Sequence, residues 1–75
     1  MEIIFSNHAN LKINQRELSR DFIIKTINSP DFTRPTRGFR EERYKYFGKN
    51  WLKVIVIKES DKIVVITAHW IAKIS

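Results

Sequence analysis

The chain has 75 residues, a net charge of +6 and no cysteine. This length predicts one small domain over residues 1–75, and the lack of cysteine excludes a disulfide framework and a thiolate metal site. No segment approaches the roughly 20 apolar residues that a membrane span needs, and the N-terminus lacks the basic start and apolar run of a signal peptide, so we expect a cytoplasmic protein without membrane contact.

A strand and two helices are predicted in the first part of the chain. Residues 2–5 (EIIF) are typical of a short strand. Ser6 is a suitable N-cap for a helix over residues 7–13, and Asn14 or Ser19 can cap a second helix. The second helix is expected to end before Pro30, because the residue before a proline avoids helical angles.

Three strands are predicted in the second part. Residues 31–38 are interpreted as a loop, because Pro35 and Gly38 interrupt any long element. Residues 42–47, 51–58 and 62–70 are rich in β-branched and aromatic side chains and predict strands. The order β-α-α-β-β-β predicts an α+β fold, with two helices on one face of a mostly antiparallel sheet.

The positive charge is concentrated in the middle of the chain. Residues 34–53 hold seven Lys or Arg and two Glu, a local sum of +5. Such a patch attracts polyanions through counterion release, which makes RNA a candidate partner. Arg37, Arg40 and Lys49 are the candidate substrate-binding residues, while an acidic protein partner or plain solubility are the alternatives.

Strand alternation predicts which side chains share a face. Pairing of the last two strands is expected to place Val56 opposite Val65, and Thr67 and His69 opposite Val54 and Leu52. The face that carries these residues is predicted to be open, and the face with Ile55 and Ile57 to lie under the helices. A homodimer through the apolar part of the open face is one alternative, resting on Val54, Val56, Ile63 and Val65.

The hairpin that precedes these strands is expected to add two cations to the open face. In the preferred register Tyr44 lies opposite Ile55, so Arg43 and Lys45 join Thr67 and His69. A slip by one residue would separate them.

This grouping suits metal-independent cleavage of RNA, in which the 2′-hydroxyl attacks its own phosphodiester. His69 is the candidate acid or base, Arg43 and Lys45 would hold the phosphate, and Thr67 would donate a hydrogen bond. No spacing typical of a metal site or a phosphate loop is present, so no metal or cofactor is expected. Each residue also has a purely structural interpretation, as part of a strand or a solvated surface.

Four short motifs resemble a known group of proteins. They are Phe5-Ser6-Asn7-His8-Ala9, Arg16-Glu17-Leu18-Ser19, Ile27-Asn28-Ser29-Pro30 and Val65-Ile66-Thr67-Ala68. This pattern, roughly S-x-H-A, R-x-[IL]-S, I-x-x-P and V-[IV]-T-A-Y, is similar to small prokaryotic domains of unknown function that are placed near the RelE-like toxins. The resemblance implies a RelE-like fold and adds His8 and Arg16 to the candidate site, together with Thr67. His69 stands where that group more often has tyrosine.

The first functional hypothesis is therefore a metal-independent endoribonuclease of toxin type, or a close relative, with an antitoxin protein as a partner. The alternative is a non-catalytic module, or a dimerising subunit, that binds nucleic acid or protein through the basic hairpin and the open face.

Overall fold

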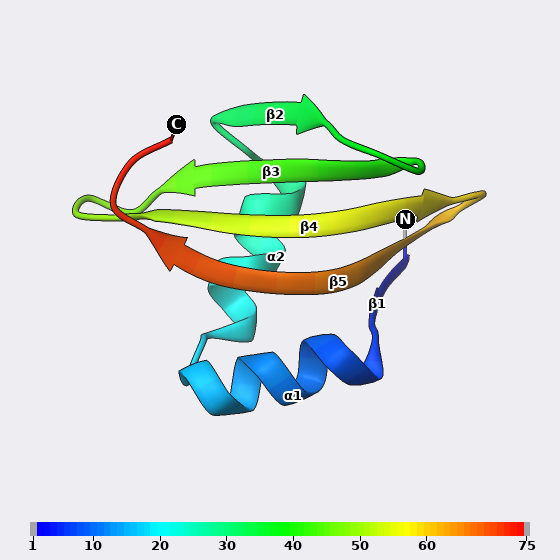
Figure 1. Ribbon diagram of the computed structural model, residues 1–75, viewed down its shortest axis with the longest axis horizontal. Helices are drawn as coiled ribbons and strands as arrows, with labels where there is room; N and C mark the ends of the chain where they lie inside the picture. Colours follow the sequence, from blue (N-terminus) through cyan, green and yellow to red (C-terminus); the bar gives the residue numbers. More distant parts are fainter. Residues whose placement is uncertain (1, 75) are drawn as a thin grey trace.

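The computed structural model describes residues 2–74 and contains two helices packed against one five-stranded sheet (Figure 1). The elements are β1 (Glu2–Phe5), α1 (Asn7–Arg16), α2 (Arg20–Asn28), β2 (Phe32–Pro35), β3 (Arg40–Tyr46), β4 (Trp51–Glu59) and β5 (Lys62–Ile71). The strands lie in the order β1-β5-β4-β3-β2, with β1 parallel to β5 and every other neighbouring pair antiparallel. The predicted α+β class is confirmed.

Both helices begin at serine caps. The Ser6 hydroxyl accepts a hydrogen bond from the Ala9 amide at 3.0 Å, and the Ser19 hydroxyl accepts one from the Phe22 amide at 3.4 Å. Each cap satisfies one of the amides that the first turn of a helix leaves without a partner. Neither helix among the described residues is long and apolar enough to cross a membrane.

The prediction of a loop over residues 31–38 is wrong, because β2 forms within it. This short strand pairs with β3 at the edge of the sheet, from Phe32 opposite Tyr44 to Pro35 opposite Glu41. Pro35 is the last residue of the edge strand, where its missing amide hydrogen interrupts no ladder. A proline would disrupt a central strand, but it is compatible with this position at the end of an edge strand.

The hydrophobic core lies between the helices and one face of the sheet. It contains Ala9, Ile13, Leu18, Ile23, Ile27, Leu52, Val54, Val56, Ile63, Val65 and Ala68. Leu52, Val54 and Val56 thus face the helices, which is the reverse of the predicted assignment for β4. The predicted assignment would have buried Lys53 beneath the helices without solvent, a costly position for a charge. The residues on which the dimer alternative rested are core residues.

A β-bulge divides β5 into two halves. Val56 pairs with Val65 as predicted, but Ile55 then pairs with Thr67, so that Ile66 is an extra residue. Beyond the bulge Val54 pairs with Ala68 and Leu52 with Trp70, and the predicted pairing of these two residues with Thr67 and His69 is wrong. The bulge reverses the alternation, so Ala68 enters the core while Thr67 and His69 turn to the opposite face.

Candidate functional site on the open face of the sheet

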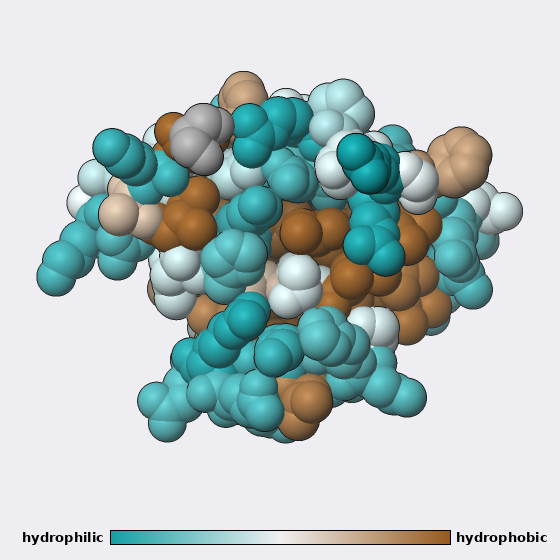
Figure 2. Space-filling view, viewed as in Figure 1, coloured by the Kyte–Doolittle hydropathy of each residue, from teal (hydrophilic) through white to brown (hydrophobic). Residues whose placement is uncertain are grey.

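The face of the sheet turned away from both helices, here called the open face, is viewed directly in Figure 1. Apolar surface lies between hydrophilic side chains on this face (Figure 2). The strands contribute Arg34 from β2, Glu42 and Tyr44 from β3, Lys53, Ile55 and Ile57 from β4, and Thr67 and His69 from β5. It is the candidate functional surface because it combines cations, a histidine and accessible apolar area.

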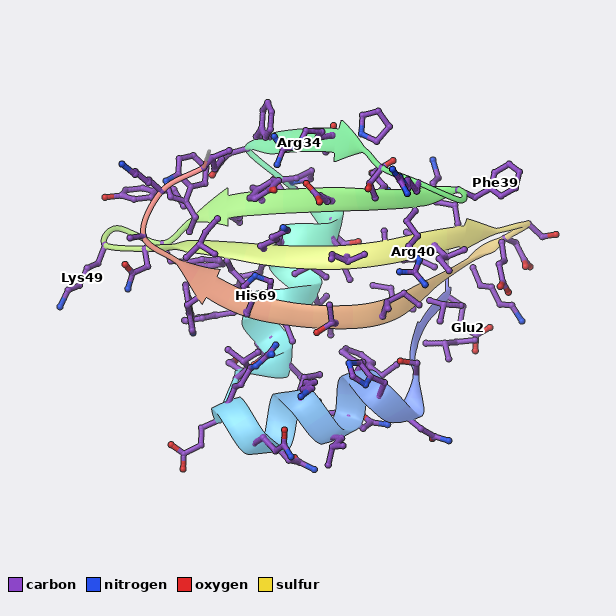
Figure 3. All side chains as sticks on the ribbon, viewed as in Figure 1. Glu2, Arg34, Phe39, Arg40, Lys49 and His69 are labelled. Carbon is purple, nitrogen blue, oxygen red and sulfur yellow. The ribbon has the colours of Figure 1, made fainter. Side chains whose placement is uncertain are left out.

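Lys53 and His69 form the centre of this surface. They are direct cross-strand partners in the β4–β5 ladder, and Ile55 and Thr67 are the next such pair on the same face. Directly opposed side chains on one face of an antiparallel pair have Cβ atoms about 4.5–5.5 Å apart. His69 is half-buried and points towards the viewer in Figure 3. The Lys53 ammonium group and the His69 imidazole therefore lie side by side on the open face.

Arg16 approaches the same position from α1. Its Nη1 atom donates to the Ala68 carbonyl oxygen at 2.8 Å and to the Thr67 hydroxyl at 3.4 Å. This contact is available because β1 pairs with β5 only as far as Val65, so the second half of β5 is an edge with unpaired carbonyls. Arg16 occupies that edge and brings a second positive charge beside His69.

Burial and these two charges together set the protonation state of His69. Burial, followed by the charges of Lys53 and Arg16, lowers the pKa of His69 below its ordinary value of 6.5, against the weaker opposing effect of Glu42. The imidazole is therefore neutral at neutral pH and can accept a proton.

Glu42 connects the centre of the open face to the edge strand β2. Its Oε1 atom accepts hydrogen bonds from the Tyr44 hydroxyl at 2.7 Å and from Arg34 Nε at 3.0 Å, and its Oε2 atom lies 3.5 Å from Lys53 Nζ. Arg34 Nη2 also donates to the Tyr44 hydroxyl at 2.8 Å. The network fixes the position of Lys53 across from His69.

Both acidic groups of this network have shifted pKa values. Burial alone would raise the pKa of Glu42, but hydrogen bonds from Tyr44 and Arg34 and the charge of Lys53 outweigh it, and the pKa is lowered from 4.5. Burial and the hydrogen bond to Glu42 raise the pKa of Tyr44 above 10.0. Glu42 is thus a stable anion and Tyr44 a stable hydrogen-bond donor, which suits a structural role better than proton transfer.

The prediction that Arg43 and Lys45 lie beside Thr67 and His69 is wrong. Tyr44 pairs with Lys53 rather than Ile55, and Arg43 and Lys45 lie opposite Val54 and Leu52, on the helix-covered face. Arg43 Nη1 donates to the Ile27 carbonyl at 2.7 Å, and Lys45 Nζ donates to the Ser29 carbonyl at 2.8 Å. These two cations bind the carbonyl end of α2, where they complement its dipole.

His8 also lies apart from the candidate site. It is exposed in the first turn of α1, eight residues before Arg16. At a rise of 1.5 Å per residue this separates the two positions by about 12 Å along the helix. The resemblance to the RelE-like group points to His8, Arg16 and Thr67. The structure brings Arg16 and Thr67 together, but His8 lies apart from them.

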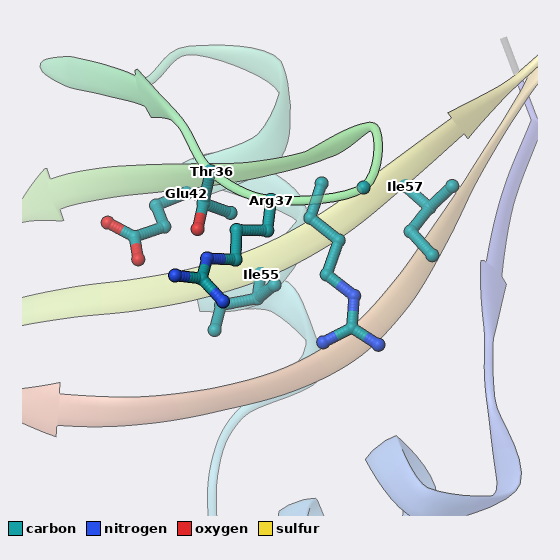
Figure 4. A pocket seen from close by; sticks show the side chains of 7 residues that line it. Thr36, Arg37, Glu42, Ile55 and Ile57 are labelled. Carbon is teal, nitrogen blue, oxygen red and sulfur yellow. The ribbon is translucent and has the colours of Figure 1, made fainter.

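The three predicted substrate-binding cations separate into two groups. Arg37 and Arg40 line a pocket of about 570 Å³ on the open face, with Thr36, Gly38, Glu42, Ile55 and Ile57. In Figure 4 the Arg37 side chain reaches from the hairpin over Ile55, on the side of Glu42. Lys49 lies at the opposite end of the sheet and lines a smaller hollow of about 310 Å³ with Phe22, Phe47, Asn50 and Trp70.

Within residues 2–74 no three His, Asp or Glu side chains come together as ligands for a metal ion.

A family model described as a domain of unknown function (DUF4258) matches residues 5–70. The chain belongs to this family. The expectation of a domain family of unknown function is thereby confirmed. The comparisons with curated proteins and with solved structures gave no significant match.

The DUF4258 match covers both helices and extends through Trp70, so it contains every residue of the open-face site. Sequence reasoning missed Lys53, Glu42, Tyr44 and Arg34 as members of that site. Glu42, Tyr44 and Tyr46 alternate with Arg43 and Lys45, so the correct choice of face would have identified Glu42 and Tyr44. Arg34 gave no such signal, because β2 was interpreted as a loop.

Proposed function

We propose that this protein is a metal-independent endoribonuclease, similar to the RelE-like toxins, whose active site is the open face around His69 and Lys53. The observation that carries the proposal is a half-buried histidine with a lowered pKa, placed directly opposite a lysine on an accessible and positively charged sheet face. RNA cleavage in which the substrate supplies its own nucleophile requires a general base and a positive charge at the phosphate, and these two residues can provide them.

In the proposed reaction neutral His69 removes the proton from a ribose 2′-hydroxyl. The O2′–P bond forms as the P–O5′ bond breaks, and Lys53 gives a proton to the leaving 5′-oxygen. Lys53 and Arg16 also stabilise the negative charge that develops on the phosphoryl oxygens. Thr67, which accepts a hydrogen bond from Arg16, positions that guanidinium group. Arg43, Lys45 and His8 have no part in this mechanism.

The resemblance to toxins adds a partner and a location to the proposal. An acidic antitoxin protein would neutralise the basic surface, and a cellular RNA target would be met in the cytoplasm. Toxicity on expression that requires His69 would support this part of the proposal.

The first experiment is incubation of the purified protein with labelled single-stranded RNA in EDTA. We expect cleavage by the unaltered protein and a loss of at least about 10²-fold in His69→Ala, because general acid–base catalysis commonly contributes that much. His8→Ala is the matched control, since it removes the other imidazole from an exposed position outside the site, and it should cleave normally.

Circular dichroism should show that both variants fold. Equal cleavage by His69→Ala and the unaltered protein would contradict the assignment of the base. If intact RNA is recovered under every condition, the ribonuclease proposal fails.

A non-catalytic RNA-binding module is the second candidate. It is favoured by the pocket that Arg37 and Arg40 line, whose lining contains no group able to accept a proton at neutral pH other than the paired Glu42. Such a module would retain RNA without cutting it, and its affinity would fall with salt.

A further inference from the structure

The tip of the β2–β3 hairpin has an unusual residue at its turn. The turn is closed by a hydrogen bond from the Arg40 amide to the Arg37 carbonyl at 3.3 Å, and its two central residues, Gly38 and Phe39, have φ values of 66° and 63°. Positive φ at both central positions is the requirement of the type I′ turn, for which Asn or Asp followed by Gly is preferred. A phenylalanine in the left-handed region is strained, and folding alone favours Gly, Asn or Asp there.

Among residues 2–74, Phe39 is also the most exposed large apolar side chain, at 91% of its full area. It points away from the sheet at one end, and Lys49 marks the other end (Figure 3). Its ring contributes nothing to the core, so neither packing nor backbone preference accounts for it. Residues held in strained backbone conformations cluster at ligand-binding and active sites.

The two arginines that flank the turn are available to an anion. Among residues 2–74 neither Arg37 nor Arg40 has an ion pair or a side-chain hydrogen bond, whereas Arg16, Arg34 and Arg43 all do. Their pocket has the apolar side chains of Ile55 and Ile57 on its floor. The hairpin therefore presents two unpaired guanidinium groups, an apolar floor and an exposed ring within one short segment.

These parts match the chemistry of a single-stranded polynucleotide. Aromatic rings stack on unpaired bases, guanidinium groups bind phosphates, and an apolar floor accepts the flat face of a base or a ribose. A duplex keeps its bases stacked on one another and offers nothing to Phe39.

We propose that the β2–β3 hairpin is a binding subsite for single-stranded RNA, in which Phe39 stacks on an unpaired base and Arg37 and Arg40 hold the adjoining phosphates over the Ile55–Ile57 floor. The proposal rests on the proposed function for its choice of RNA. It assigns the hairpin a recognition role that is separate from the chemistry at His69.

The test measures binding and not cleavage. The probe is a fluorescein-labelled single-stranded 2′-O-methyl oligonucleotide in EDTA, which lacks the free 2′-hydroxyl and cannot be cut by the proposed reaction. We expect Phe39→Asn to weaken binding by about tenfold while keeping or raising the melting temperature, because asparagine tolerates the left-handed turn but cannot stack. Phe39→Trp should bind as well as the unaltered protein.

The arginines are tested by the double variant Arg37→Ala/Arg40→Ala. Loss of two phosphate contacts should reduce the slope of log affinity against log salt by about 1.4, since each contact to a single strand contributes about 0.7. The matched control is Lys12→Ala/Lys25→Ala, which removes the same charge from the helix layer and should leave the slope nearly unchanged.

The outcomes separate the two proposals. If Phe39→Asn and the double arginine variant bind like the unaltered protein, or if a duplex of the same length binds as tightly, the hairpin proposal is overturned. No binding of the oligonucleotide by the unaltered protein would also overturn it. If binding depends on Phe39 while unmodified RNA is never cut, the ribonuclease proposal fails and the hairpin proposal stands.

Discussion

At the scale of single residues, the environment of His69 explains why one of two histidines is suited to catalysis. His69 is half-buried and lies close to two cations, whereas His8 is exposed on the first turn of a helix. Desolvation and positive neighbours both disfavour the imidazolium, so they act in the same direction on this side chain. A base that is already neutral at physiological pH needs no further activation.

The lowered pKa of His69 predicts a specific pH dependence. The base acts only when neutral, so cleavage should rise with pH through the folded-state pKa of His69, at a pH below 6.5, and then level off. In an NMR titration the His69 pKa should rise towards 6.5 in Lys53→Met, because one of the charges that lowers it is lost. Lys12→Met is the control and should leave the titration unchanged. A His69 pKa at or above 6.5 in the unaltered protein would contradict this account.

At the scale of elements, helix α2 is held to the sheet partly by Arg43 and Lys45, the two cations predicted from the sequence to belong to the catalytic site. Arg43, with a side chain only 12% exposed, binds both Glu41 and the Ile27 carbonyl. Hydrogen bonds that involve a charged group contribute about 1.5–3 kcal/mol each. The contact therefore links the end of α2 to the middle of β3.

Arg43→Met should accordingly lower the free energy of unfolding by about 1.5–3 kcal/mol in urea titrations, because the Ile27 carbonyl loses its partner. Binding of the uncleavable oligonucleotide by the folded variant should not change. Arg37→Met provides the reverse comparison, with unchanged stability and weaker binding. Loss of cleavage in Arg43→Met at normal stability would return Arg43 to the active site.

The elements also show how far sequence reasoning extends. Serine caps, strand composition and the α+β order were predictable, because each depends on neighbouring residues. The bulge at Ile66 was not, since Ile66 is as good a strand residue as those beside it and the extra residue appears only when β5 pairs with β4. Because the side-chain period of a strand is two, that one residue decided which face carries His69.

The prediction of which face of β4 lies under the helices was wrong for a related reason. Leu52, Val54 and Val56 are apolar, and so are Ile55 and Ile57 on the opposite side. A strand with apolar residues on both faces does not indicate which one the helices cover. Thr67 and His69 were placed on the open face only because this error and the missed bulge compensated for one another. Arg43 and Lys45 had no such compensation.

At the scale of the whole molecule, the two proposed sites lie on one surface at a fixed separation. Lys53 and Ile57 are four residues apart on β4, which corresponds to about 13 Å along a strand. A rigid sheet therefore sets the distance between the position of the chemistry at His69 and the hairpin subsite. A stacked strand with one phosphate per 3.4 Å would span that distance with about four nucleotides.

This geometry predicts that cleavage depends on substrate length. A dinucleotide at His69 and Lys53 does not extend to Arg40 and Phe39 at the Ile57 end, so kcat/KM should be low and should increase until the RNA spans both positions. Remote contacts of this kind supply binding energy that orients the reacting group. In Phe39→Asn/Arg40→Ala the long substrate should be cut at about the rate of the dinucleotide, whereas the dinucleotide itself should be cut normally. Equal kcat/KM for all lengths in the unaltered protein would mean that the hairpin takes no part in substrate recognition.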